Sequence, residues 1–142
     1  MSALNVAIAG FGTIGSGVAH VLKQHSEHPD ANINLVGILE CDTQGVFARP
    51  WFENNPDLFY ENQKKLFADS RVNVIVETIG GSGFARELTM AALQNGKHVI
   101  TANKDLIAIH GTELMKIAQE NGRHLLFEAS VAGAIPVLRL LM

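Results

Sequence analysis

The stretch that decides the fold is Val6-Ala7-Ile8-Ala9-Gly10-Phe11-Gly12-Thr13-Ile14-Gly15, in which an apolar run stops at the pattern G-x-G-x-x-G. The run predicts a strand buried on both faces, and apolar residues at helical spacing over 14–24 predict a helix directly after it. In such a unit the first glycine permits the tight turn, the second lets a pyrophosphate approach the backbone, and the third lets the helix pack closely on the strand. The candidate ligand-binding residues are Gly10, Phe11, Gly12, Thr13, Ile14 and Gly15. A glycine-rich turn without a ligand is the alternative.

Strands and helices alternate along the rest of the chain. Strands are expected at 6–9, 33–39, 72–76, 98–100 and 124–127, and helices at 14–24, 63–68, 84–94, 112–120 and 136–142. Residues 45–57 contain two prolines and predict a long loop with one helical turn. The alternation predicts an α/β fold of the Rossmann type, which is a doubly wound, mostly parallel sheet with helices on both faces.

Composition and charge exclude several classes of protein. The length of 142 residues suits one domain, and the net charge of -3 argues against nucleic acid as a partner, because a phosphate backbone requires a basic face. No apolar run reaches the about 18 residues of a membrane span, and the start does not resemble a signal peptide. A single cysteine, Cys41, excludes an internal disulfide and favours a cytoplasmic location. None of the six histidines has neighbours at a metal-ligand spacing.

An acidic residue follows the second expected strand, where a dinucleotide's ribose 2′-hydroxyl is bound in this type of fold. Glu40 is the first candidate and Asp42 the second. Both lie beyond the usual spacing of about 20 residues from the glycines, which the polar insertion at 25–32 explains. No lysine or arginine lies between Lys23 and Arg49, so a 2′-phosphate has no obvious partner and NAD is favoured over NADP. A solvated strand end is the alternative for Glu40.

Lys104 comes shortly after the fourth expected strand, in Thr101-Ala102-Asn103-Lys104. Ligands of open α/β sheets bind outside the carboxyl ends of the strands. The residues that follow such ends are Gly10, Glu40, Thr78 and Lys104. A lysine there could bind an acidic substrate group or move a proton to a carbonyl oxygen. An ordinary surface lysine is an equal alternative.

The segment Glu128-Ala129-Ser130-Val131-Ala132-Gly133-Ala134-Ile135-Pro136 follows the last expected strand. Its small residues allow close backbone approach, and exposed carbonyl oxygens could coordinate a hard cation. A tight connection between a strand and a helix is an equally good interpretation.

Several strings together resemble homoserine dehydrogenases. The loop that runs from Gly10 to Val18 is similar to that family's nucleotide loop, and Val76-Glu77-Thr78-Ile79-Gly80-Gly81 is similar to one of its strand ends. Two further strings are more specific, namely Gly96-Lys97-His98-Val99-Ile100-Thr101-Ala102-Asn103-Lys104 and Phe127-Glu128-Ala129-Ser130-Val131-Ala132-Gly133-Ala134-Ile135-Pro136. The resemblance extends over nearly the whole chain.

The resemblance implies interconversion of L-homoserine and L-aspartate 4-semialdehyde with NAD or NADP, in threonine and methionine biosynthesis. It implies that Lys104 acts at the active site and in nicotinamide binding, and that Thr78 and Thr101 lie near the nicotinamide ribose. It also implies a monovalent cation, usually sodium. The implied cation ligands are the side chain of Glu128 and the backbone oxygens of Val131, Gly133 and Ile135. Ala134 departs from the family pattern, in which a second glycine is common there, and this makes the cation site less certain than the nucleotide site.

The family's substrate-binding acids lie in a C-terminal catalytic domain that has no counterpart in residues 1–142. We therefore expect these residues to be a dinucleotide-binding domain that binds cofactor without full activity, in an enzyme that is a homodimer. The chain stops inside an apparent apolar helix, which indicates a piece of something longer. Two alternatives remain: another amino-acid-pathway reductase, and a stand-alone nucleotide-binding or redox-sensing domain.

Overall fold

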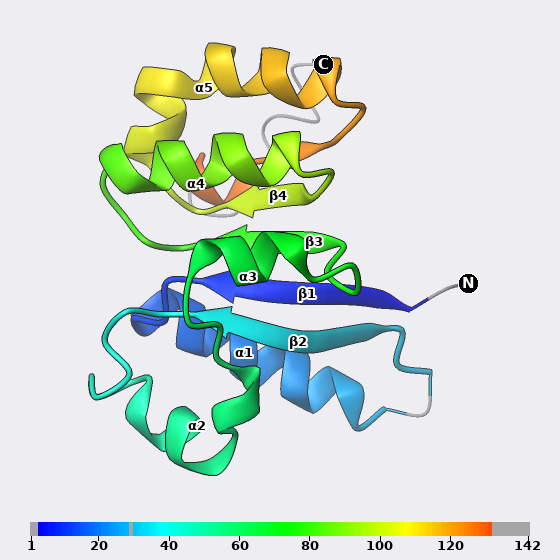
Figure 1. Ribbon diagram of the computed structural model, residues 1–142, viewed down its shortest axis with the longest axis vertical. Helices are drawn as coiled ribbons and strands as arrows, with labels where there is room; N and C mark the ends of the chain where they lie inside the picture. The colour runs from blue at the N-terminus through cyan, green and yellow to red at the C-terminus, as the bar shows by residue number, and fades with distance from the viewer. Residues whose placement is uncertain (1–2, 29, 132–142) are drawn as a thin grey trace.

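Five strands form one sheet in the order β2-β1-β3-β4-β5 (Figure 1). The computed structural model describes residues 3–28 and 30–131. The strands are β1 (Leu4–Ala9), β2 (Ile33–Leu39), β3 (Val74–Glu77), β4 (His98–Thr101) and β5 (Leu125–Leu126). Every neighbouring pair is parallel. The predicted doubly wound α/β fold is therefore confirmed.

Helices cover both faces of this sheet. They are α1 (Thr13–Ser26), α2 (Arg49–Asn54), α3 (Gln63–Ala68), α4 (Gly83–Gln94) and α5 (Lys104–Glu120), with the 3-10 turns η1 (Pro56–Leu58) and η2 (Glu128–Ser130). Because successive strand residues point to opposite faces, Ile8 packs with α1 and α2, whereas Ala7 and Ala9 pack with α3, α4 and α5. Figure 1 shows α3 and α4 in front of the sheet and α1 behind it.

The carboxyl ends of four strands are aligned in one row. Ala9 pairs with Leu39 on one side and with Glu77 on the other, and Glu77 pairs with Thr101. The turns that follow these residues therefore leave the sheet side by side. The chain moves outward in opposite directions from β1 and β3, so this edge is also the topological switch point at which α/β sheets bind ligands.

A further strand starts beside β2 and is not completed. Phe59 forms a single parallel bridge with Ile38, and the Tyr60 N–H donates to the Ile38 carbonyl over 2.8 Å. The Tyr60 ring lies against Gly37, where a Cβ would come within 2.0 Å of it. The Tyr60 hydroxyl donates to Asp69 over 2.8 Å, and burial together with this carboxylate raises the pKa of Tyr60 to about 12. The segment thus covers the outer edge of β2.

Some element boundaries differ from the sequence-based expectations. α5 begins at Lys104, eight residues before the expected start at 112, because the Asn103 Oδ1 caps it by accepting from the Leu106 N–H over 3.1 Å. The third strand is Val74–Glu77 and the fifth is only Leu125–Leu126. The expected loop at 45–57 contains α2 and the start of η1, and the expected helix at 136–142 lies outside the described residues.

Within 3–28 and 30–131, no helix combines the length and apolar character needed to cross a bilayer.

Candidate functional site

A cavity of about 580 Å³ opens at the aligned carboxyl ends of β1, β2 and β3. This volume is typical of small-molecule sites. The wall is formed by Gly10, Phe11, Gly12, Leu39, Glu40, Cys41, Glu61, Asn62, Gln63, Thr78, Ile79 and Phe84. The structure thus brings together the glycine turn, the acid after β2 and the turn after β3, as the sequence predicts.

Two of the three glycines hold the turn in place by close backbone contacts. Gly10 has a φ of +89°, and a Cβ on it would lie 2.8 Å from the Ile79 nitrogen. A Cβ on Gly15 would lie 2.0 Å from the Gly10 carbonyl oxygen. Side chains at these positions would force the glycine turn away from both α1 and the turn after β3.

The first turn of α1 is open toward the cavity. Gly12 is the N-cap of α1, and a Cβ placed on it would meet no atom within 4 Å. No side chain caps this helix and its first turn has no acidic residue, whereas Asn103 caps α5. The first hydrogen bond inside the helix runs from the Ser16 N–H to the Gly12 carbonyl over 3.0 Å. The preceding N–H groups and the positive end of the helix dipole are therefore available to an anion.

The Glu40 carboxylate ties the end of β2 to the glycine turn. One oxygen accepts from the Phe11 N–H over 2.6 Å, and the other accepts from the Asp42 N–H over 2.9 Å. Burial alone would raise the pKa of Glu40, but the N–H groups of Asp42 and Phe11 outweigh burial and lower it. Glu40 is thus held ionised at neutral pH in the cavity wall, as required of a ribose acceptor.

Asp42, the alternative ribose acceptor, has a different environment. Its Oδ1 accepts from the Gln44 N–H over 3.2 Å, and its carbonyl accepts from the Gly45 N–H over 3.2 Å. Asp42 therefore stabilises a tight turn after β2 and lies outside the wall of the 580 Å³ cavity. Asp42 lines a neighbouring hollow of about 260 Å³ together with Phe11, Gly12 and Glu40, so Glu40 alone of the two candidates borders both spaces.

Thr78 links the turn after β3 to the glycine turn. Its hydroxyl donates to the Gly10 carbonyl over 2.7 Å, and its N–H donates to the Ala9 carbonyl over 2.9 Å. Thr78 also lines the cavity. It therefore holds the Gly10 peptide in the orientation that leaves room for Gly15.

Thr101 and Lys104 lie at the same sheet edge but in different surroundings. Thr101 is 0% exposed, and its hydroxyl donates to Glu77 and accepts from the Asn103 N–H. Lys104 is exposed as the first residue of α5 and is not part of the cavity wall. A cation at a helix N-terminus opposes the helix dipole. The charge of Lys104 therefore does not stabilise α5.

Seven wall residues lie outside the site predicted from the sequence, namely Leu39, Cys41, Glu61, Asn62, Gln63, Ile79 and Phe84. Ile79 and Phe84 provide apolar wall surface, and Phe84 is 50% exposed at the start of α4. The Gln63 Oε1 is buried without a hydrogen-bond partner among the described residues. An aromatic residue at the start of the helix expected at 84–94 is the one signal that could have identified Phe84 from the sequence. Ile79 and Gln63 carry no such signal.

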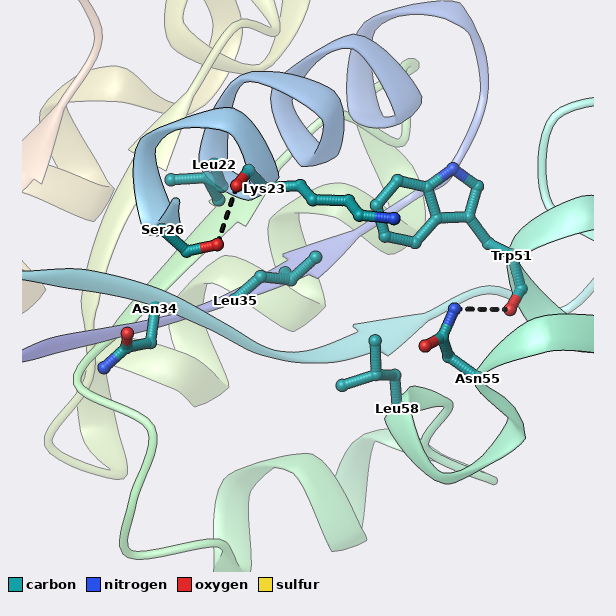
Figure 2. Close-up of a pocket in the computed structure, with 8 residues that line it drawn as sticks. All are labelled: Leu22, Lys23, Ser26, Asn34, Leu35, Trp51, Asn55 and Leu58. Carbon is teal, nitrogen blue, oxygen red and sulfur yellow. Dashed lines mark hydrogen bonds between the residues drawn. The ribbon is translucent and has the colours of Figure 1, made fainter. Parts of the chain in front are cut away.

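A second, smaller hollow lies away from this edge (Figure 2). It has a volume of about 220 Å³, and it lies between the last turns of α1, the start of β2 and the segment that contains α2 and η1. Figure 2 shows the Lys23 side chain reaching over Trp51, with its Nζ 5.8 Å from the ring centroid. The volume of this second hollow is smaller than about 300 Å³, which is the lower end of the range for small-molecule sites.

The expected cation ligands are only partly within the described residues. Glu128 begins η2, and the Val131 N–H donates to its carbonyl over 3.1 Å. Gly133 and Ile135 lie outside the described residues. Within 3–28 and 30–131, no three His, Cys, Asp or Glu side chains are grouped as they would be around a metal ion.

Comparisons with known proteins agree with one another. The family model described as "Homoserine dehydrogenase, NAD binding domain" matches residues 10–128. The homoserine dehydrogenase of Bacillus subtilis is 36% identical over 142 residues, which are 99% of this chain and 33% of that enzyme. That of Corynebacterium glutamicum is 39% identical, over 96% of this chain and 31% of the enzyme. The chain thus spans about a third of the length of these curated relatives.

Solved structures of homoserine dehydrogenases also superpose on this chain. A homoserine dehydrogenase from Thiobacillus denitrificans superposes with a TM-score of 0.81 at 35% identity, over 99% of this chain and 33% of that one. A hyperthermophilic archaeal homoserine dehydrogenase in complex with NADPH superposes with a TM-score of 0.72 at 26% identity, over 97% of this chain and 47% of that one.

The contact between Gly15 and the Gly10 carbonyl generates a testable prediction. We expect Gly15→Ala to lower the free energy of unfolding by about 1–3 kcal/mol, because the added methyl group must displace backbone. Gly17→Ala is the matched control, since a Cβ there meets no atom within 4 Å. It should raise the free energy of unfolding by about 0.5–1 kcal/mol through its helix propensity. Urea denaturation measures both, and equal effects would contradict the contact.

Proposed function

The chain belongs to the homoserine dehydrogenase NAD-binding domain family, and from this premise we propose that residues 1–142 form a dinucleotide-binding domain that binds NAD at the glycine turn. The observation that carries the proposal is the uncapped first turn of α1, which faces a cavity of about 580 Å³ beside the Glu40 carboxylate. The site combines what the two halves of a dinucleotide need, namely N–H groups for the pyrophosphate and a carboxylate for a ribose.

Different residues of the site contact different parts of the cofactor in this proposal. The N–H groups at Gly12, Thr13, Ile14 and Gly15 bind the pyrophosphate in this proposal. Glu40 accepts a hydrogen bond from the adenosine ribose, while Ile79 and Phe84 supply apolar surface of the cavity wall. When bound, the nicotinamide group supplies hydride transfer. Thr78 orients the glycine turn through the hydrogen bond that its hydroxyl donates to the Gly10 carbonyl.

The surroundings of Glu40 favour NAD over NADP in this proposal. Its carboxylate would repel a 2′-phosphate, and no lysine or arginine lies in residues 24–48 to compensate. Arg49 is the next cation along the chain, and its Nε already contacts the Glu53 carboxylate over 2.7 Å. The hyperthermophilic archaeal homoserine dehydrogenase was solved in complex with NADPH, so the preference proposed for this chain rests on the residues around its own ribose site.

The complete enzyme would interconvert L-homoserine and L-aspartate 4-semialdehyde, in the cytoplasm and within threonine and methionine biosynthesis. Lys104 would donate and accept a proton at the substrate oxygen or fix the nicotinamide end. The rest of the enzyme would supply the substrate-binding residues and most of the dimer interface. These statements rest on family membership, because the chain spans about a third of its relatives.

A sodium ion near η2 is a further part of the proposal. Glu128 supplies a carboxylate, and Val131 follows directly after η2. Carboxylate and carbonyl oxygens suit a hard cation. With Gly133 and Ile135 outside the described residues, this part rests on the resemblance alone.

Replacing Gly12 tests the pyrophosphate site. We expect Gly12→Val to abolish NAD binding, because a branched side chain would fill the open space over the first turn of α1. Titration calorimetry on folded protein measures it, and Gly83→Val, at another open glycine position at a helix start, is the control. Unchanged affinity in Gly12→Val would mean that the glycine turn is structural only.

Replacing Glu40 tests the ribose site. We expect Glu40→Gln to weaken NAD more than NADP, because it removes both the charge that repels a 2′-phosphate and the strongest ribose acceptor. The ratio of the two dissociation constants from calorimetry is the readout. If Asp42→Asn changes that ratio and Glu40→Gln does not, the ribose lies two residues further on.

Replacing Lys104 separates activity from stability. In the complete enzyme we expect Lys104→Ala to lower kcat by about 100-fold, the lower range for a positioned proton donor. The same substitution should leave the free energy of unfolding unchanged or slightly raised, because a cation is removed from a helix N-terminus. Lys116→Ala, further along α5, serves as the control. A near-normal kcat would reduce Lys104 to a surface residue.

A further inference from the structure

Glu77 is a fully buried carboxyl group in the row of strand ends. It is the last residue of β3 and is 0% exposed. One oxygen accepts from the Ile79 N–H over 2.7 Å, and the other accepts from the Thr101 hydroxyl over 2.5 Å. Among the described residues it takes part in no ion pair. A buried carboxyl group without a cation is costly to fold, which requires an explanation other than stability.

The hydrogen bonds continue from Glu77 to the start of α5. The Thr101 hydroxyl oxygen accepts from the Asn103 N–H over 3.0 Å. The Asn103 side chain then caps α5 at Leu106 and donates to the Gly81 carbonyl over 2.5 Å. Starting from one carboxyl group, the network therefore reaches both ends of the turn after β3 and the residue directly before Lys104.

The other branch of the network supports the glycine turn. Glu77 accepts a hydrogen bond from the Ile79 N–H. The same Ile79 nitrogen is the atom that a Cβ added to Gly10 would approach most closely, at 2.8 Å. Thr78, between the two, donates its hydroxyl to the Gly10 carbonyl. A shift of the Ile79 peptide would therefore move the surface against which the glycine turn packs.

We propose that Glu77, Thr101 and Asn103 form a positioning network that holds the glycine turn and Lys104 at a fixed separation. The network rests on the proposed function, because it positions the pyrophosphate turn relative to the group that acts at the nicotinamide end. Thr101 accordingly acts through Glu77 and not by touching the nicotinamide ribose, since no part of it is exposed.

The chemistry of the two neighbours explains why the residue is a glutamate. The Ile79 N–H donates to one oxygen of Glu77, and the Thr101 hydroxyl donates to the other while its own oxygen accepts from the Asn103 N–H. Two donors require two acceptor oxygens on one side chain. A glutamine at position 77 keeps the shape but has one acceptor oxygen, so in Glu77→Gln the Thr101 hydroxyl can no longer donate to that side chain while the Ile79 N–H does.

The experiment compares buried hydroxyl groups in the 142-residue chain. Thr101→Val removes the hydroxyl of the network, and Thr101→Ser keeps it. Thr89→Val is the matched control, because Thr89 is also 0% exposed and its Oγ1 has no hydrogen-bond partner among the described residues. Calorimetric titrations use two probes, NAD and ADP, where ADP contains the pyrophosphate and the adenosine but no nicotinamide ribose. Circular dichroism verifies that each variant is folded.

We expect Thr101→Val and Glu77→Gln each to weaken both NAD and ADP by about tenfold, which corresponds to the loss of one buried hydrogen bond. The double variant should be little worse than either single one, since both break the same link. Thr101→Ser should restore affinity, and Thr89→Val should leave it unchanged.

Three results would overturn the network. Loss of NAD affinity with unchanged ADP affinity would show that the glycine turn does not depend on the network. Equal effects of Thr101→Val and Thr89→Val would show a general effect of buried hydroxyl removal. Unchanged affinity in Thr101→Val would show no positioning role. Failure of the unsubstituted chain to bind either probe would instead contradict the proposed function itself.

Discussion

The contact of the glycine turn with its two neighbours is the constraint on which the rest of the structure depends. The Gly10 carbonyl lies where a Cβ of Gly15 would be, and the Ile79 nitrogen lies where a Cβ of Gly10 would come too close. Because both contacts involve backbone, β1, the first turn of α1 and the turn after β3 can only be assembled in one arrangement. That arrangement leaves the uncapped N-terminus of α1 facing the cavity.

The cavity wall is preorganised by hydrogen bonds that do not need a ligand. Glu40 holds the Phe11 N–H, Thr78 holds the Gly10 carbonyl, and Glu77 holds the Ile79 N–H. Each bond joins or supports turns that follow different strands. The cavity wall is therefore already ordered once the chain has folded. Binding then costs less conformational entropy than it would in a mobile loop. The same bonds explain why the acidic side chains Glu40 and Glu77 lie beside the proposed cofactor site: they accept from the backbone N–H groups of the turns.

The sequence predicts what depends on local pattern and misses what depends on distant contacts. The strand Ile33–Leu39 and the helix Gln63–Ala68 have the expected bounds, since apolar spacing and turn residues determine them. The start of α5 was missed because the string from Thr101 to Lys104 has the composition of a turn, and only the Asn103 cap shows that a helix begins there. The inward orientation of Thr101 depends on Glu77, on a neighbouring strand. The cation site near Glu128 stays a prediction.

Binding of NAD at the glycine turn can be tested by following the backbone amide NMR shifts when NAD is added to the 142-residue chain. We predict that the largest changes fall on Gly12, Thr13, Ile14 and Gly15, whose N–H groups precede the first hydrogen bond inside α1, and that Trp51 and Lys23 at the second hollow are unaffected. Changes centred on Trp51 with an unperturbed glycine turn would rule out binding at that turn, because the cofactor would then occupy the hollow of Figure 2.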